Sequence, residues 1–230
     1  MTTKTASQTQ VRLNRRQVLA TALEIANREG LEALSMRRLG AKLGVDPMTI
    51  DHHTGGKERL LDGVAELLWE EVALPESSSD PIEALRNLAR SLRDLFRRHP
   101  EAAPLILRCS RLIRPQLELY GAYLDALDRI ELGGREPASV LRSVLSYALG
   151  YGYAEISMLG VQCGPIDSQT LSKRELLLYL GQALPPDTPP SLAEAAMVLI
   201  ADCDSNQCFE DGLELMLAGL ATSTGARRAT

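Results

Sequence analysis

The stretch 35-SMRRLGAKLGVDPMTIDHHT-54 decides the fold of the N-terminal part of this chain. Two short helices that cross at a steep angle need apolar anchors, a small residue at the crossing and a turn residue that tolerates positive φ. The stretch supplies all of these in register, at Leu39, Gly40, Leu43, Gly44, Val45 and Ile50. The pattern therefore predicts a helix-turn-helix rather than an ordinary helical hairpin.

Capping and breaking residues predict where the helices around this stretch begin and end. Asn14 followed by Gln17 approximates a capping box, and Gly30 is suited to end the helix that they start. Asp46 before Pro47 opens the second helix of the motif, because proline loses nothing at the first helical position. The helices expected here are capped or broken near 14 and 30, 35 and 44, and 46 and 53, with a fourth over 57–72.

The second helix of the motif is expected to present its outer face to DNA, because Ile50 points inward. The N-terminal end of such a helix enters the major groove, where side chains meet base edges. Helix N-termini also attract phosphate oxygens. Neighbouring His52 and His53 point about 100° apart on a helix, so they do not chelate one metal ion. The candidate DNA-binding residues are Ser35, Arg37, Pro47, Met48, Thr49, Asp51, His52, His53 and Lys57.

The composition favours an all-α protein with an uneven charge. Hydrophobic residues make up 45% of the 230 residues and aromatic residues 4%, with Leu and Ala abundant. Residues 1–60 contain ten basic and six acidic side chains, a net charge of +4. Residues 61–230 contain fifteen and twenty-four, a net charge of −9. This asymmetry indicates that the N-terminal part meets a polyanion.

Several classes of protein are disfavoured. No apolar run approaches the ~20 residues that cross a bilayer, and residues 1–16 lack the apolar segment of a signal peptide, so we expect a cytoplasmic protein. GxSxG, HExxH, P-loop and dinucleotide fingerprints do not occur, so we expect neither catalytic residues nor a cofactor. The cysteines lack CxxC spacing, which argues against a metal site; they are Cys109, Cys163, Cys203 and Cys208.

The chain resembles the tetracycline-repressor (TetR) family. The resemblance is specific in 35-SMRRLGAKLGVDPMTI-50, the HH that follows, and 57-KERLLDGVAELL-68. It is looser in 99-HPEAAPLI-106, 150-GYGYAE-155 and 210-EDGLELMLAGL-220. It implies a homodimeric repressor that binds a palindromic operator and is released by an unknown small-molecule effector.

The resemblance also implies residue roles. Arg37, Met48 and Thr49 would contact bases or the groove, and Ser35 and Lys57 would contact phosphates. Two positions depart from the family pattern: Asp51 replaces a phosphate-contacting tyrosine, and Thr54 replaces an apolar residue. A carboxylate near a phosphate is repulsive by about 1 kcal/mol at ~4 Å in water, so we expect weakened binding.

The expected organisation is an N-terminal three-helix DNA-binding domain followed by a larger helical ligand-binding and dimerisation domain. Its parts are a flexible arm at 1–12, the helix-turn-helix domain at 13–56, a connecting helix at 57–73 and the regulatory domain at 81–222. The helices expected in the regulatory domain lie near 81–98, 101–110, 115–131, 138–160, 170–182, 191–203 and 206–221.

Two residue sets in the regulatory domain are candidates for its functions. Apolar and aromatic residues with a few polar groups suit an effector pocket; they are Trp69, His99, Ile106, Tyr120, Tyr147, Tyr151 and Glu155. Small and apolar faces suit a four-helix dimer interface; they are Leu141, Leu145, Ala148, Gly152, Leu213, Met216, Leu217 and Leu220.

Three further questions stay open at this level. Asp51 and Thr54 leave room for a helical ligand-binding or adaptor protein whose DNA binding is weakened. Cys203 and Cys208 leave room for a thiol-switched regulator. One helix of the regulatory domain carries four arginines along a face, which suits either a solvated surface or an anion-binding one; they are Arg86, Arg90, Arg93 and Arg97.

Overall fold

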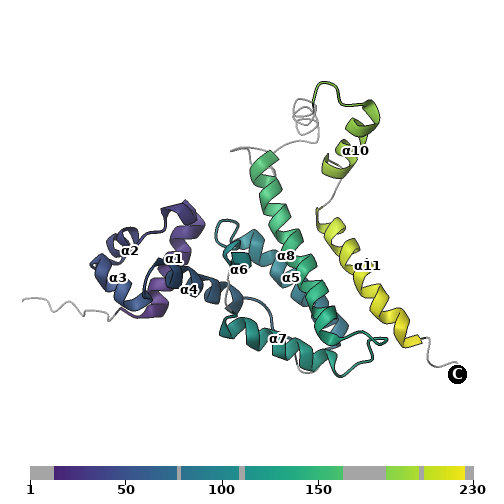
Figure 1. Ribbon diagram of the computed structural model, residues 1–230, viewed down its shortest axis with the longest axis horizontal. Coiled ribbons are helices and arrows are strands. Elements are labelled where there is room, and N and C mark those ends of the chain that lie inside the picture. Colours follow the sequence, from purple (N-terminus) through teal and green to yellow (C-terminus); the bar gives the residue numbers. More distant parts are fainter. Residues whose placement is uncertain (1–12, 77–78, 109–111, 163–184, 202–204, 226–230) are drawn as a thin grey trace, which may run out of the picture. The chain divides into compact units, whose positions relative to one another are not determined.

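All regular elements that the structure describes are helices, as the sequence predicts (Figure 1). The structure is a computed structural model, and it describes residues 13–76, 79–108, 112–162, 185–201 and 205–225. The chain divides into two compact units. The first unit comprises Met1–Glu71 and His99–Gln116, and the second comprises Val72–Arg98 and Leu117–Thr230.

Helix α1 (Arg15–Glu29) begins at the predicted capping box. The Asn14 side chain accepts a hydrogen bond from the Gln17 amide, and the Gln17 side chain accepts one from the Asn14 amide, each at 2.9 Å. The helix ends at Gly30, whose φ of 81° suits glycine. A short 3-10 turn, η1 (Leu31–Ala33), leads to the next helix.

Helices α2 (Met36–Leu43), α3 (Pro47–Thr54) and α4 (Lys57–Glu70) complete the N-terminal fold. The Ser35 hydroxyl caps α2 by accepting a hydrogen bond from the Arg38 amide at 3.1 Å. The Asp46 carboxylate caps α3 by accepting one from the Met48 amide at 2.8 Å. The predicted limits are confirmed to within two residues, because the caps and glycines that set them act locally.

The core of the first unit also contains a segment from far along the chain. Leu19 and Ile25 of α1 pack with Leu39, Ile50 and Val64, and all five are at most 2% exposed. Residues 99–108 join them through α6 (Leu105–Arg108), which packs against α4. The sequence placed residues 99–116 in the regulatory domain, whereas in the structure they belong to the first unit.

The second unit is built on a pair of long helices. Helix α5 (Pro81–Arg98) packs along α8 (Pro137–Gln162), and α11 (Ser205–Gly225) contacts both (Figure 1). Helix α7 (Arg114–Leu127) precedes α8, and α10 (Pro190–Ala201) precedes α11. The predicted arm at 1–12 and the helix expected at 170–182 lie outside the described residues.

Candidate DNA-binding interface

The close crossing of α2 and α3 depends on Gly40. A Cβ atom at this position would lie 2.7 Å from the backbone oxygen of Val45 and 3.2 Å from the nitrogen of Pro47. The Val45 amide donates to the Gly40 carbonyl at 3.0 Å, and Gly44 between them adopts the left-handed conformation, with φ 69°. The predicted turn therefore needs glycine for two different reasons: the close approach of backbone at Gly40 and the positive φ at Gly44.

Helix α3 anchors one face in the core and exposes the other. Ile50 is fully buried, and the buried Thr54 hydroxyl donates to the Ile50 carbonyl at 3.0 Å, so a polar residue is accommodated there. On the outer face, the side chain of Met48 is the most exposed large hydrophobic group of the unit, at 81%. Asp51 lies one turn further along the helix and is also exposed.

The remaining residues predicted on α3 lie near this face. Pro47 and His52 are exposed, and Thr49 and His53 are half-buried. The rings of the two histidines meet edge to face with centroids 6.0 Å apart. Among the described residues, no group of three or more His, Cys, Asp or Glu side chains is placed to hold a metal ion.

Three basic residues of α2 differ in what they contact. Arg38 donates to Glu29 at 2.7 Å, and Lys42 pairs with Glu24 at 2.9 Å. These hydrogen bonds hold the pKa values of both carboxyls below their usual range. Arg37 is exposed, and the described residues offer it neither a hydrogen bond nor an ion pair. Arg37 is thus the α2 cation available to a molecule outside the chain.

The two predicted phosphate contacts lie at helix N-termini. Ser35 is exposed, and its hydroxyl caps α2 as an acceptor, which leaves its own proton to donate. Lys57 is exposed at the first position of α4, where Gly56 provides no side-chain cap. The first amides of α4 therefore have no partner within the helix, and the Lys57 ammonium lies at the same helix end.

In the second unit, a buried ion pair lies among aromatic rings. Arg93 of α5 donates two hydrogen bonds to Glu155 of α8, at 2.9 and 2.8 Å, and their side chains are 6% and 13% exposed. The Arg93 guanidinium lies 4.8 Å from the ring centroid of Phe209 and 5.4 Å from that of Tyr151. Tyr147 stacks on Phe209 and donates to its carbonyl at 2.8 Å.

The structure brings together three of the seven predicted pocket residues. Tyr147, Tyr151 and Glu155 share the cluster around Arg93. Trp69 and Ile106 are instead 2% and 5% exposed within the first unit, where they form part of its core. Trp69 lies on α4 and Ile106 on α6, two helices that pack against each other, so these two residues lie apart from the cluster around Arg93. His99 also belongs to the first unit, and Tyr120 is half-buried on α7.

The arginine face of α5 is partly solvated, with the side chains of Arg86 and Arg90 24% and 42% exposed, and its arginines are paired with carboxylates. Arg86 pairs with Glu214 of α11 at 2.6 Å, and Arg90 pairs with Glu210 at 2.8 Å. These arginines hold the pKa values of both glutamates below their usual range. Together with the buried Arg93, they tie α5 to α8 and α11, and their charge is matched by carboxylates rather than offered to an anion.

Four of the residues predicted for the dimer interface are buried within their own chain. Leu141, Leu145 and Ala148 are at most 8% exposed, and a Cβ on Gly152 would lie 2.7 Å from the Phe96 ring of α5. This face of α8 is already covered by α5, so the small residues admit a helix of the same chain. The small residues that α8 exposes lie on another face; they are Ser139, Ser143, Ser146 and Gly150.

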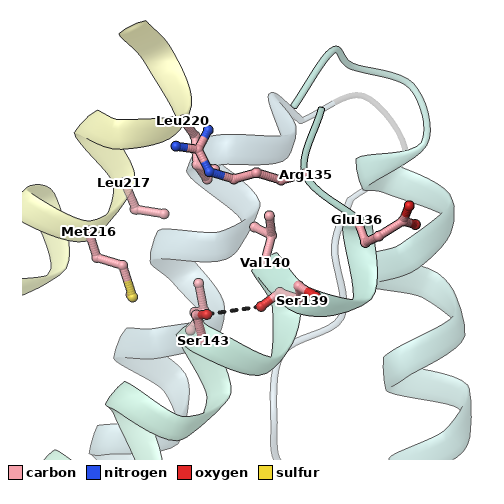
Figure 2. Close-up of a pocket in the computed structure, with 9 residues that line it drawn as sticks. Arg135, Glu136, Ser139, Val140, Ser143, Met216, Leu217 and Leu220 are labelled. Carbon is pink, nitrogen blue, oxygen red and sulfur yellow. Dashed lines mark hydrogen bonds between the residues drawn. The ribbon is translucent and has the colours of Figure 1, made fainter. Parts of the chain in front are cut away.

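The predicted dimer residues of α11 divide between core and groove. Leu213 and Leu217 are at most 1% exposed, whereas Met216 is half-buried. Figure 2 shows Met216, Leu217 and Leu220 facing the start of α8 across a pocket of about 430 Å³. Apolar and polar side chains line the pocket; its residues are Arg135, Glu136, Ser139, Val140, Ser143, Val144, Met216, Leu217 and Leu220.

A comparison with known families identifies the second unit. The profile described as "Tetracyclin repressor-like, C-terminal domain" matches residues 74–224, more than half of the chain. The chain belongs to the tetracycline repressor family. It is therefore a transcriptional regulator of a family whose repressors bind DNA, and the resemblance stated from the N-terminal motif is confirmed.

Curated relatives match either most of the chain or a part of it. The tetracycline repressor protein class D of Escherichia coli is 29% identical over 217 residues, which cover 90% of this chain and 89% of that protein. The transcriptional repressor DrrR1 of Streptomyces coeruleorubidus is 40% identical over 91 residues, which cover 36% of this chain and 32% of that protein.

Solved structures agree with this assignment. The TetR family protein ActR of Streptomyces coelicolor, in complex with actinorhodin, superposes with a TM-score of 0.72 at 28% identity, covering 93% of this chain and 99% of that one. TetR of Acinetobacter baumannii AYE has a TM-score of 0.69 at 22% identity, with 92% and 98% covered, and shows the shared fold.

Two further features of this member of the tetracycline repressor family concern residues around Phe209. The contact between Arg93 and Phe209 joins residues more than a hundred positions apart, and no spacing in the sequence indicates it. Cys208, beside Phe209, is disulfide-bonded, and the other three cysteines lie outside the described residues. In the parts of the chain that the structure describes, no helix has the length and apolar character to cross a membrane.

Proposed function

We propose that this chain is a homodimeric repressor that binds a palindromic operator through α2 and α3 and is released by a small-molecule effector. The observation that carries the proposal is the outer face of α3, which exposes Met48 and Asp51 while Ile50 anchors the helix. An exposed short helix after a tight turn fits the major groove of DNA.

In this proposal, bases are read from both helices of the motif. Arg37 is suited to donate two hydrogen bonds to a guanine, because its guanidinium has no partner among the described residues. Met48 provides an apolar contact for a thymine methyl group, and Thr49 provides a hydroxyl. Pro47, His52 and His53 border the same face.

Phosphate contacts hold the motif in register. Ser35 and Lys57 lie at the N-termini of α2 and α4, where amide groups and the helix dipole add to their attraction for phosphate. Asp51 opposes this attraction, so we expect moderate affinity. The same repulsion supports an alternative function, in which the helix-turn-helix motif has lost DNA binding and the chain acts as a ligand-binding adaptor.

A homodimer would place two such motifs on two half-sites about one DNA turn apart. We propose that the partner covers the exposed small residues of α8, with Ser143 and Gly150 at the centre, and the groove beside Met216 and Leu220 of α11. Apolar lining at an open groove supports this, because water leaves it when a second helix packs there. Leu141, Leu145, Ala148 and Gly152 would support α8 from within.

The effector is proposed to bind in the second unit, near Tyr147, Tyr151 and Glu155. The structure of ActR with actinorhodin supports a small-molecule ligand for this chain as well. Binding there would change the operator affinity by linkage, and a coupling of ~1–3 kcal/mol corresponds to a 5–150-fold change.

The test is fluorescence anisotropy with labelled DNA from upstream of the protein's own gene. We expect saturable binding whose affinity falls steeply with salt, since phosphate contacts release counterions. Actinorhodin and related aromatic compounds are then titrated against the complex. If the protein does not bind this DNA even at low salt, the ligand-binding adaptor is favoured. If it binds DNA but none of the compounds releases it, the proposed effector site is contradicted.

A thiol-switched regulator is the second candidate, favoured by the disulfide-bonded Cys208. Oxidation or reduction at this position would act on α11 next to Phe209. The same anisotropy titration, run with and without dithiothreitol, tests it: equal DNA affinity in both states rejects a thiol switch. We propose no enzymatic activity for the chain.

A further inference from the structure

Most basic side chains of helices α1 to α4 are matched by acidic ones. Eight lysines and arginines lie in these helices, and five of them form ion pairs with glutamates of the same unit; they are Arg15, Arg16, Arg28, Arg38 and Lys42. The other three are Arg37, Lys57 and Arg59, which are exposed and have neither an ion pair nor a hydrogen bond among the described residues. These three side chains therefore carry the positive charge that the four helices offer to another molecule.

Arg59 is the member of this trio to which the sequence assigned no role. It is the third residue of α4, two positions after Lys57. Its side chain folds back over Gly55, whose amide closes the last turn of α3 by donating to the Asp51 carbonyl at 2.6 Å. A Cβ atom built on Gly55 would lie 2.9 Å from Nη1 and 3.0 Å from Cδ of Arg59. The guanidinium thus lies at the C-terminal end of α3.

The missing side chain of Gly55 makes room for this guanidinium. Gly55 has a φ of 74°, a left-handed conformation that asparagine also adopts at the end of a helix. Backbone conformation alone therefore does not demand glycine here. A side chain at position 55 would occupy the space that the Arg59 guanidinium fills, so glycine keeps the cation against the end of α3.

The carboxylates closest to Arg59 along the chain do not neutralise it. Asp51 lies one turn before Gly55 on α3, Glu58 directly precedes Arg59, and Asp62 follows it by one turn of α4. In the part of the chain that the structure describes, none of the three forms an ion pair with Arg59. The negative end of the α3 dipole attracts the guanidinium without consuming its hydrogen-bond donors. Its charge and donors therefore stay available to an anion.

We propose that Arg59 contacts DNA by binding a phosphate of the operator backbone at the C-terminal end of α3. A guanidinium suits this task because two parallel N–H groups can donate to one phosphate. The contact offsets the repulsion from Asp51, whose carboxylate is exposed on the same helix. Because it is made to the backbone, it contributes affinity and carries no sequence information. This inference rests on the proposed function, since it concerns the same complex with DNA.

The experiment follows the full chain by fluorescence anisotropy over a series of salt concentrations. Two labelled duplexes are used: the fragment from upstream of the protein's own gene and a shuffled duplex of the same length and composition. Arg59→Ala is expected to weaken binding to both by about five- to ten-fold at low salt, because a phosphate contact does not depend on sequence. The slope of the logarithm of the association constant against that of the salt concentration should shrink by about 0.9 per protomer. Arg59→Lys keeps the charge and should retain this slope.

Arg16→Ala is the matched control. It removes the same charge from an arginine that is 76% exposed but is paired with Glu70 of α4. The affinity for both duplexes should stay within about two-fold of the wild type, with an unchanged salt slope. Arg37→Ala gives the opposite contrast, because loss of a base contact should weaken binding to the operator fragment more than to the shuffled duplex.

A double-mutant cycle separates the position of the guanidinium from its charge. Gly55→Asn retains a residue that tolerates the left-handed backbone, while its side chain takes the space of the guanidinium. We expect Gly55→Asn to weaken DNA binding about three- to five-fold in the wild type and to have no effect in the Arg59→Ala background. An equal loss in both backgrounds would overturn the role of Gly55 in placing Arg59.

The outcomes distinguish this contact from the proposed function. If the wild type binds the operator fragment and Arg59→Ala changes neither affinity nor salt slope, the contact is overturned and the proposed function stands. A loss that is equal at every salt concentration and comes with a lower unfolding temperature would also overturn it, because Arg59 would then act on the fold. If the wild type binds neither duplex, the proposed function fails and the contact fails with it.

Discussion

The two units of this chain use arginine in opposite ways. In the first unit, Arg37 is exposed on α2 and has no partner among the described residues. In the second, Arg93 is 6% exposed and donates two hydrogen bonds to Glu155. The first arginine is available to another molecule, whereas the second holds helices of its own chain together. The contrast shows that a charged residue on a predicted helix gains its role from what the fold places opposite it.

The largest effect is expected from removing the partner of the buried arginine. Glu155→Ala removes the carboxylate that accepts two hydrogen bonds from the buried Arg93 guanidinium, and breaking a buried pair in this way costs about 3–5 kcal/mol. Urea denaturation should show a loss of that size in the free energy of unfolding. A loss under about 1 kcal/mol would mean that Arg93 is solvated and that the two arginines differ less than the structure indicates.

A comparison of two glycines should give the next largest effect. Gly40→Val brings a side chain against the backbone of Val45 and Pro47, and overpacking of this kind costs about 1–3 kcal/mol. Gly121→Ala in α7 is the control, because nothing lies within 4 Å of its Cβ. It should stabilise the protein by about 0.5–1 kcal/mol. Thermal unfolding of both variants checks the pair, and destabilisation by Gly121→Ala would contradict it.

Arg37→Ala should separate binding from stability. Loss of a bidentate guanine contact weakens operator binding by about 1–3 kcal/mol, or roughly ten- to a hundred-fold. The unfolding free energy should stay within about 0.5 kcal/mol of the wild type, since an exposed side chain without partners is removed. Fluorescence anisotropy and urea denaturation on the same sample test this. Equal losses in the free energies of binding and of unfolding would show that Arg37 stabilises the fold rather than contacting DNA.

Asp51→Tyr is expected to tighten operator binding by about 1 kcal/mol, because a carboxylate facing phosphate is replaced by a hydroxyl that donates to it. Asp51→Asn separates the loss of charge from the gain of a ring and should recover part of the effect. Anisotropy at two salt concentrations measures both variants. Weaker binding by the tyrosine variant would show that Asp51 does not face the backbone of DNA.

The smallest effect concerns pH and the α5–α11 pairs. Hydrogen bonds from Arg90 and Arg86 lower the pKa values of Glu210 and Glu214 in the folded state. These pairs therefore stabilise the fold above the unfolded pKa of about 4.3, and the stabilisation is lost as pH falls through the lowered values. A Glu210→Gln, Glu214→Gln variant should lose less stability than the wild type on acidification, as followed by thermal unfolding. Identical profiles would exclude a role for these pairs.

Features that depend on interactions within a few residues were predicted correctly from the sequence. The caps at Asn14, Ser35 and Asp46 and the glycine at 44 act within a few residues, and each is found where the pattern placed it. The burial of Ile50 follows from helical periodicity in the same stretch. The roles of the exposed residues of α3 in DNA binding stay predictions.

The second unit was predicted as a set of helices but not as an arrangement. Leu141 and Gly152 were assigned to a dimer interface; Leu141 is 3% exposed within its own chain, and a Cβ on Gly152 would meet the Phe96 ring of α5. Helical spacing shows which residues share a face, but it does not reveal whether that face meets the same chain or another one. Trp69 was assigned to an effector pocket because of its residue type. A large apolar side chain suits a protein core and a ligand pocket equally well, so the sequence does not distinguish them.

The amino-acid sequence by itself determined the helix-turn-helix, the family and the separation of a basic N-terminal part from an acidic remainder. All three depend on residue types, short spacings or simple counts. Tertiary structure alone decided that residues 99–116 return to the first unit, that Arg93 is matched by Glu155, and that His99 joins α1 to the end of α4. The hydrogen bonds of these residues link positions that are 28, 62 and 72 apart in the sequence. Only the packing of helices against one another brings such residues together.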